Sequence, residues 1–277
     1  MSNFKKQLLA GPYLIWMIGF ILLPLVFILY YAITAADGSF TFSNIAAIAD
    51  PVHVKSILLS LKLGFLCTLV CLVLSYPLCM ILSTFRFRHQ SFVVFLFILP
   101  MWMNFMLRIL AWRLLLSNNG IVNAILEAVG TGHVKMLNTP TAVVFGMVYD
   151  FLPFMILPIY TTILKIDKSY LEAAKDLGAT EAKAFLKVTL PLSKAGIASG
   201  ISMVFLPSMT NYVVSNWMTN NKVTIIGDFI DGAFLNDVWG AGSVTAIILL
   251  LAMFLFTWLT GGFKEDDSGA AKAKGLW

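Results

Sequence analysis

Charged side chains are scarce in this sequence. Only 12% of its 277 residues are Asp, Glu, Lys or Arg, whereas 59% are hydrophobic, and the mean hydropathy is +0.87. Soluble domains average about 25% charged residues, so the composition excludes an ordinary soluble domain. The sequence therefore predicts an integral membrane protein.

Groups that carry out chemistry are also few. The three histidines are scattered, and the three cysteines, Cys67, Cys71 and Cys79, fall within one apolar stretch. A metal site needs more ligands close together, so buried, unreactive thiols are the simpler interpretation. The G-x-x-x-x-G-K-[ST] phosphate loop does not occur, and neither does a Gly-Lys dipeptide. We expect no catalytic residue, no metal and no cofactor, and therefore no enzyme.

Long apolar stretches are what the sequence does have. A helix needs about 20 residues to cross hydrocarbon, and six stretches approach that length: 13–33, 58–82, 91–110, 141–164, 194–217 and 241–263. No alternating β-pattern accompanies them, and backbone groups in lipid must be satisfied within helices. We therefore predict an all-α membrane protein, a bundle of six transmembrane helices. It forms one domain, residues 1–263, followed by a short tail, 264–277.

The positions of lysine and arginine predict the orientation, because basic residues gather in cytoplasmic loops. Lys5 and Lys6 precede the first stretch, Arg86 and Arg88 follow the second, and six lysines lie between the fourth and the fifth. These regions all share one side of the membrane. We predict that both termini and segment 165–192 are cytoplasmic. The net charge of +5 then reflects topology, and no basic patch indicates nucleic acid.

Segment 165–192 is charged, and the positions of its helix-capping and helix-ending residues predict two short helices. Ser169 and Glu172 have the S-x-x-E spacing of a capping box, which predicts a helix start at Ser169. Gly178 is placed to end this helix at a C′ position. Thr180 can cap a second helix, and Pro191 is expected to stop it.

The two predicted helices are amphipathic. Leu171, Ala174 and Leu177 share a face of the first helix, and Phe185 and Val188 line the second. Such a segment suits a helix-in-groove contact with a partner protein. It equally suits a loop that lies on the membrane surface, so the residues alone leave both interpretations open.

The spacing within the segment matches a family motif. Glu-Ala-Ala, three residues, Gly, nine residues and then Val-x-Leu-Pro are supplied by Glu172, Ala173, Ala174, Gly178, Val188, Leu190 and Pro191. This resembles the EAA loop, EAA-x3-G-x9-I-x-L-P, of permease subunits of binding-protein-dependent ABC importers. Val188 is the one departure. Six helices with this loop between the fourth and fifth also match that family, so the resemblance covers most of the chain.

Residues 99–112, 149–160 and 172–179 further resemble permeases of spermidine/putrescine importers. The resemblance implies a type I ABC importer permease in a bacterial cytoplasmic membrane that imports polyamines. Its EAA loop would be a coupling helix seated in a separate ABC ATPase dimer. The other implied partners are a second, homologous permease subunit, an extracytoplasmic substrate-binding protein and membrane lipid.

Two alternatives remain. A related permease for sulfate, iron or thiamine would share most of these features. A secondary transporter or a channel would need no ATPase, and the EAA loop is the feature that counts against it.

Asp150 is the clearest candidate on a translocation path. It lies about ten residues into the fourth stretch, roughly 15 Å along a helix axis, beside Tyr149 and before Pro153 and Pro158. An acid at this depth costs about 2.5–3.5 kcal/mol on insertion scales and usually faces a cavity or a partner. It either binds a substrate ammonium, with a cation–π contribution from Tyr149, or makes a structural pair with another helix.

Four further polar residues complete the candidate path: Asn104, Arg108, Asn211 and Tyr212. Interhelical hydrogen bonds would explain the asparagines equally well. Arg108 and Arg113 are expected to extend to the membrane interface.

Overall fold

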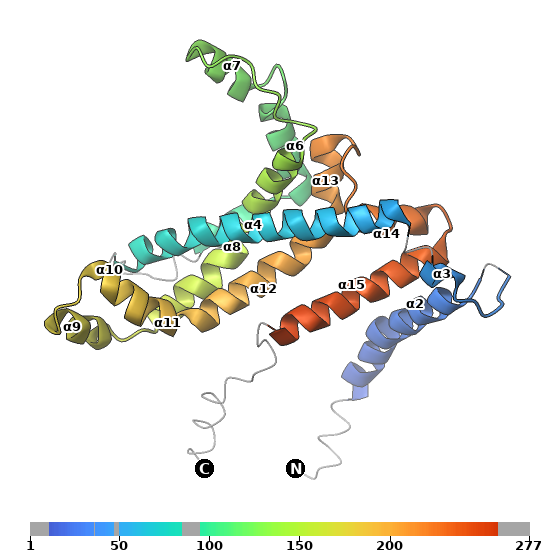
Figure 1. The fold of residues 1–277 in the computed structure, drawn as a ribbon, viewed down its shortest axis with the longest axis horizontal. Helices are drawn as coiled ribbons and strands as arrows, with labels where there is room; N and C mark the ends of the chain where they lie inside the picture. The colour runs from blue at the N-terminus through green and yellow to red at the C-terminus, as the bar shows by residue number, and fades with distance from the viewer. Residues whose placement is uncertain (1–10, 36, 47–49, 85–94, 260–277) are drawn as a thin grey trace, which may run out of the picture.

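The computed structural model describes residues 11–35, 37–46, 50–84 and 95–259, and these residues are almost entirely helical (Figure 1). Apart from an isolated bridge between Thr34 and Phe40, they contain no β-structure. In chain order the elements are η1 (Ile18–Leu22), α2 (Leu23–Ile33), α3 (Ser43–Ala46), α4 (Pro51–Thr84), η3 (Leu99–Trp102), α6 (Phe105–Leu115), α7 (Ile121–Ala128), α8 (Pro140–Leu164), α9 (Lys168–Asp176), α10 (Glu181–Ala184), η4 (Phe185–Thr189), α11 (Leu190–Leu192), α12 (Lys194–Thr210), α13 (Tyr212–Thr219), α14 (Ile226–Leu235) and α15 (Trp239–Leu259).

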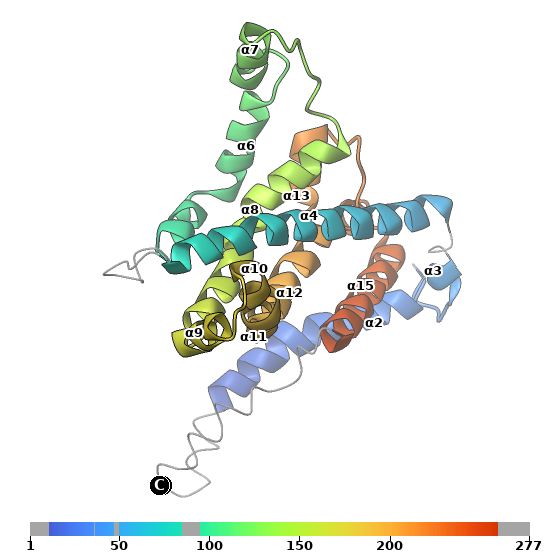
Figure 2. The same ribbon diagram turned by 60° about the vertical axis from the view of Figure 1, so that its left-hand side comes forward.

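Three long helices, α4, α8 and α12, pack against one another and form the centre of the molecule (Figures 1 and 2). Their shared core is apolar and includes Met147, Ile156 and Val204, each at most 1% exposed. The three cysteines of α4 are also fully buried and free. The prediction of buried thiols is therefore confirmed.

Glycines allow these helices to approach closely. A Cβ atom at Gly196 of α12 would lie 2.7 Å from the carbonyl oxygen of Pro158 in α8, and one at Gly64 of α4 would lie 2.8 Å from Cγ of Met209 in α12. Small residues at helix interfaces are typical of membrane bundles, where close backbone packing replaces the hydrophobic driving force. The α4, α8 and α12 unit is therefore closely packed along its length.

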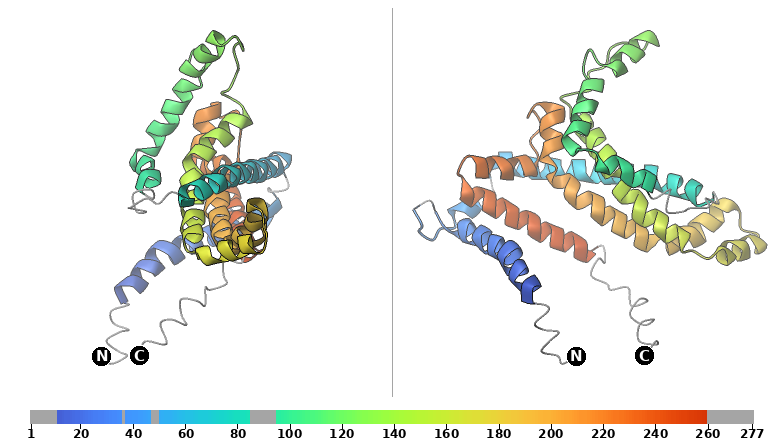
Figure 3. Two further views of the ribbon diagram at one scale, coloured as in Figure 1. Left: turned by 90° about the vertical axis from the view of Figure 1, so that its left-hand side faces the viewer. Right: turned by 180° about the vertical axis from the view of Figure 1, so that it is seen from behind.

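The remaining elements lie around this unit. Helix α2 packs on α15 (Figure 3), whereas α6 and α7 project away from the central helices (Figure 2). Helices α9 to α11 lie at the end of the molecule where α4 and α8 end and α12 begins (Figure 1). Segment 165–192 is thus continuous with two of the three central helices.

The span predictions hold with two corrections. Four helices of the described chain are long and apolar enough to cross a membrane, and the number reaches six if each of two bent helix pairs forms one span. The third predicted span, 91–110, was wrong as a single helix, because the chain bends by 88° between residues 95–102 and α6. The fifth, 194–217, is interrupted at Asn211, between α12 and α13. The tail 264–277 lies outside the described residues.

Candidate functional site

The EAA segment, residues 165–192, begins with a cap that the sequence analysis assigned wrongly. The first helix is α9, and its N-cap is Asp167, whose Oδ1 accepts a hydrogen bond from the Ser169 N–H at 2.9 Å. That hydrogen bond lowers the pKa of Asp167. Ser169 already lies in the first turn, so the expected capping box with Glu172 does not form. Asp167, whose carboxylate accepts from the N–H only two residues ahead, occupies the N-cap position two residues before Ser169.

The turn at Gly178 is as predicted. Its φ is +79°, and its N–H donates to the carbonyl of Lys175 while the next N–H, of Ala179, donates to Ala174. This pair of hydrogen bonds is the Schellman arrangement, which requires a left-handed residue at C′. Because any residue other than glycine is strained at this φ, Gly178 fixes the direction in which the chain leaves α9.

The second helix begins as predicted and ends later than predicted. Thr180 caps α10, its Oγ1 accepting a hydrogen bond from the Lys183 N–H at 3.4 Å. Helical structure then continues through η4 and α11 to Leu192, so Pro191 does not stop it. Pro191 lies within this continuous helical run, directly after the π-helical turn η4. The 65° bend towards α12 follows at Ser193.

A buried hydrogen bond holds this bend against α4. The Ser193 hydroxyl lies 2.6 Å from the Tyr76 hydroxyl of α4 and donates to the carbonyl of Leu190, so Tyr76 is the donor to Ser193. The ring of Tyr76 also meets Phe185 edge-on, 5.5 Å between centroids. The sequence alone does not predict this contact. Its only signal was a tyrosine within an apolar stretch, which needs a partner when buried.

The surface of the EAA segment is divided. Phe185 and Val188 are half-buried, as predicted, and so is Ala174 of the Glu-Ala-Ala motif. Leu177, which was expected to share the packed face, is 89% exposed. The exposed motif residues are Glu172, Ala173, Gly178 and Pro191, while Leu190 is half-buried. The segment therefore packs on the bundle through its second half and presents α9 outward.

The candidate path residues in α6 and α8 do come together. Nη2 of Arg108 lies 3.2 Å from Oδ1 of Asp150, and the two side chains are 9% and 5% exposed. The approach is oblique, since Asp150 Oδ1 has no properly directed hydrogen bond among the described residues. The guanidinium also lies 5.8 Å from the ring centroid of Tyr149, and Trp112 meets the same ring edge-on.

The expectation that Arg108 extends to the interface is therefore wrong. The chain changes direction at Asn104, so that α6 brings Arg108 alongside α8 instead of continuing the third span. Arg113, five residues further along, donates a hydrogen bond to Oδ1 of Asn220 at 2.6 Å. Asp150 thus has a cationic partner on another helix, and a buried charge of this kind usually does.

The two candidate asparagines sit at the two helix interruptions. Asn104 caps α6 by accepting a hydrogen bond from the Leu107 N–H, and Asn211 caps α13 in the same way through the Val214 N–H. Each side chain replaces a carbonyl acceptor that the broken helix no longer supplies. Tyr212 follows directly as the first residue of α13 and is half-buried. Neither asparagine lies in the Arg108–Asp150 pair.

Comparison with known proteins decides the family. The model of the family described as "binding-protein-dependent transport system inner membrane component" matches residues 7–264.

The chain belongs to this family.

The permease resembles polyamine transport proteins in sequence. It is 36% identical to the spermidine/putrescine transport system permease protein PotB of Escherichia coli over 87% of this chain and 90% of the relative. It is 35% identical to PotB of Haemophilus influenzae over 88% of this chain and 89% of the relative.

The permease resembles importer subunits in fold. One chain of the crystal structure of a bacterial alginate ABC transporter, in complex with an alginate pentasaccharide-bound periplasmic protein, matches it with a TM-score of 0.80. That match has 15% sequence identity and covers 95% of this chain and 94% of that chain. The fold is therefore that of a type I ABC importer permease, and the protein is a multi-pass inner membrane protein.

One charged residue of this permease lies within a predicted span but is not among the candidate site residues named from the sequence. Lys62 lies within the second apolar stretch, and its side chain is exposed on α4. Leu58 and Phe65 lie on the same face and are 61% and 62% exposed. The sequence itself marks Lys62, because a lysine inside an apolar span is unusual.

Proposed function

We propose that this permease is the membrane-spanning subunit of an ATP-driven, binding-protein-dependent importer of polyamines, with spermidine and putrescine as substrates. The observation that carries the proposal is the 36% identity to spermidine/putrescine permeases across 87% of the chain. The permease would form part of the translocation path, and a separate ABC ATPase dimer would supply the energy.

The EAA segment would couple the two parts. Its proposed contact residues are Glu172, Ala173, Ala174, Gly178, Val188, Leu190 and Pro191. The outward surface of α9 and the exposed Leu177 suit a helix seated in a groove of the ATPase. The Tyr76–Ser193 hydrogen bond would transmit a displacement of the segment to α4.

The exposed face of α4 around Lys62 favours the presence of a second permease subunit. A charged side chain within a span usually faces a water-filled cavity or a protein partner, because lipid solvates it poorly. The exposed Lys62, between Leu58 and Phe65, therefore favours a homologous permease across this face, with the translocation path between the two.

The path itself would include Asn104, Arg108, Tyr149, Asp150, Asn211 and Tyr212. With Arg108 beside it, Asp150 presents no unbalanced charge. A substrate ammonium would therefore have to compete with the guanidinium for the carboxylate, with Tyr149 as the aromatic neighbour. Such an exchange would make the site transient, which transport requires.

The orientation and domain limits complete the proposal: one domain over residues 1–263, with both termini and the EAA segment cytoplasmic. Activity reporters fused after Arg88, Lys168 and Phe263 are expected to report cytoplasmic positions. Fusions after Asp50, Gly132 and Asn220 are expected to report extracytoplasmic positions. An external reading after Lys168 would overturn the coupling role.

The substrate is tested by reconstitution. Proteoliposomes containing the permease, its ATPase, the second permease and the substrate-binding protein should accumulate labelled spermidine or putrescine when ATP is enclosed with the ATPase. Unlabelled polyamine should compete, whereas sulfate, ferric iron and thiamine should not. Competition by one of those three, with no polyamine uptake, would assign the permease to the alternative solute. Uptake without the ATPase would indicate a secondary transporter.

A further inference from the structure

An open pocket of about 310 Å³ lies where α6 ends and the chain leaves α13. Its lining is polar apart from one indole, and consists of Arg113, Asn216, Trp217, Asn220 and Asn221. These five residues include one cation and three amides, and none of the five is acidic. Arginine beside side-chain amides is a donor set that suits a carboxylate.

The guanidinium of Arg113 is held in place but not neutralised. Its Nη2 donates to Oδ1 of Asn220 at 2.6 Å, and no carboxylate of the described residues lies within ion-pair distance of it. Arg113 is half-buried, and its nitrogen atoms that lack a hydrogen bond are not buried. A guanidinium carries five N–H groups in a planar fork that matches a carboxylate. Arg113 therefore offers accessible donors to a group that enters the pocket.

The turn that carries the amides is fixed from behind. Asn220 and Asn221 have φ values of +50° and +59°, in the left-handed region that asparagine adopts more readily than most residues. Two fully buried hydroxyls hold the chain that follows: Ser215 Oγ donates to the carbonyl of Val223 at 2.6 Å, and Thr219 Oγ1 accepts from the Val223 N–H at 3.2 Å. The acceptor that positions Arg113 is thus set by the fold of this turn, before any ligand arrives.

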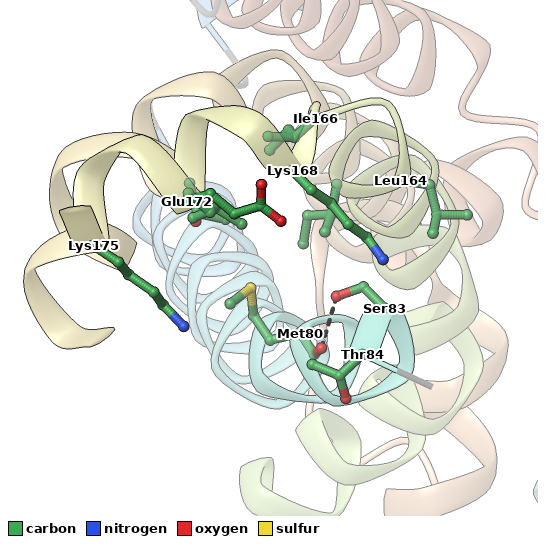
Figure 4. A pocket seen from close by; sticks show the side chains of 11 residues that line it. Met80, Ser83, Thr84, Leu164, Ile166, Lys168, Glu172 and Lys175 are labelled. Carbon is green, nitrogen blue, oxygen red and sulfur yellow. Dashed lines mark hydrogen bonds between the residues drawn. The ribbon is translucent and has the colours of Figure 1, made fainter. Parts of the chain in front are cut away.

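The Arg113 pocket and the EAA segment lie at opposite ends of α8. Just before α8 begins, the Asn138 N–H donates to the carbonyl of Met218 in α13 at 3.0 Å. Where α8 ends, α9 meets the last turns of α4 and α8 around a separate cavity that Glu172 lines (Figure 4). The 25 residues of α8 separate the two ends by about 37 Å. If the EAA segment faces an ATPase, as proposed, the Arg113 pocket faces the other side of the membrane.

The charge of the pocket decides what it can receive. A polyamine does not suit it, because the guanidinium repels ammonium groups. A carboxylate on a protein does, and the family is one of binding-protein-dependent transport systems. The binding protein approaches the side opposite to the ATPase, which is the side of Arg113. Charge complementarity of this kind guides two proteins together and fixes their register.

We propose that the Arg113 pocket receives an acidic side chain of the substrate-binding protein when that protein docks. The guanidinium pairs with the carboxylate, the amide of Asn221 at the rim can donate to it, and the indole of Trp217 forms the apolar wall for its methylene groups. The proposal rests on the proposed function for the orientation of the permease, but it does not depend on which solute is transported.

The test is binding of the substrate-binding protein to the assembled transporter in lipid nanodiscs, measured by biolayer interferometry. Arg113→Gln is expected to raise the Kd about tenfold, because it removes one member of a hydrogen-bonded charge pair. Arg113→Lys keeps the charge but loses the fork, and should raise the Kd about threefold. Asn220→Gly tolerates the left-handed backbone and removes the acceptor, so its Kd should lie between those of the parent and Arg113→Gln. Added salt should weaken binding of the parent more than that of Arg113→Gln.

Lys135→Gln is the control for net charge, because Lys135 is an exposed lysine between α7 and α8 that does not line the pocket. It should bind as the parent does. An unchanged Kd in Arg113→Gln, or an equal rise in Lys135→Gln, would overturn the docking site even if polyamine uptake is observed. A lower melting temperature of Arg113→Gln with an unchanged Kd would make Arg113 a structural residue instead.

Uptake by the same transporters separates this proposal from the proposed function. A raised Kd in Arg113→Gln without polyamine uptake by the parent would keep the docking site and refute the polyamine substrate alone. Sulfate uptake that requires Arg113, with an unchanged Kd for the binding protein, would assign the pocket to an anionic solute and refute both proposals.

Discussion

The EAA segment and the Arg108–Asp150 pair are two charged regions of one apolar permease, and they are held in opposite ways. The EAA segment is exposed, and its shape depends on hydrogen bonds between near neighbours, at Asp167, Gly178 and Thr180. The pair is buried, and its two members come from different helices. Changes in the segment should therefore alter function and spare the fold, whereas changes in the pair should damage the fold first.

The largest effect on stability is expected for Asp150→Asn. Removing one partner of a buried ion pair leaves an uncompensated charge and typically costs about 3–5 kcal/mol. The free energy of unfolding in mixed micelles measures this loss. The double variant Arg108→Met with Asp150→Leu removes both charges and should recover most of it. If Asp150→Asn is as stable as the parent but no longer transports, the pair serves the proposed translocation path without stabilising the fold, and the contrast drawn above fails.

The next largest effect is expected for Gly178→Val, and it should fall on transport. A β-branched residue at φ +79° is strained, so α9 would tilt against α10. Reconstituted uptake should decrease at least about tenfold, while the melting temperature changes little. Gly130→Val is the matched control, since Gly130 has a φ of +82° and open space around it on another loop. Equal loss of uptake in both variants would remove the special role of the EAA segment.

A smaller effect is expected at Asn211, which combines local capping with a half-buried position. Asn211→Ala removes the acceptor for the Val214 N–H and should cost about 1 kcal/mol. Asn211→Ser should retain most of the stability, because serine is also a good N-cap. Unfolding measurements on the two variants separate capping from a simple loss of volume, for which serine would behave as alanine does.

The smallest effect is expected from pH at Asp228, in α14. Burial raises the pKa of Asp228 from 3.8 to about 6, although the hydrogen bond from the Ile225 N–H opposes the shift. The folded state therefore holds this proton more tightly than the unfolded state does. The added stability is complete below the ordinary pKa of 3.8 and disappears as the pH rises through about 6.

Melting curves of the parent and Asp228→Asn at intervals between pH 4 and pH 7.5 test this prediction. The parent should lose stability relative to the variant as the pH rises across that range. Parallel curves would show that Asp228 does not titrate in this window.

The same contrast explains how far the sequence could predict the molecule. Helix positions followed from apolar length, and the turn at Gly178 and the cap at Thr180 followed from local chemistry. The start of α9 was misassigned by two residues because Asp167 and Ser169 are both good caps. The partner of Asp150 could not be predicted from the sequence, because the pairing depends on the bend at Asn104. An apolar stretch has the same composition whether its helix is straight or bent.

Close packing through Gly64 and Gly196 has a mechanical consequence. Helix α8 has 25 residues and is about 37 Å long, and α12 lies closely against it at Gly196. If the EAA segment contacts an ATPase as proposed, a displacement of the segment would move the two helices together as one rigid unit. Rotation by about 10° around its middle would move each end by roughly 3 Å, as the length of an α-helix dictates. Such a rotation would displace the far end of α8 without any helix in the unit changing shape.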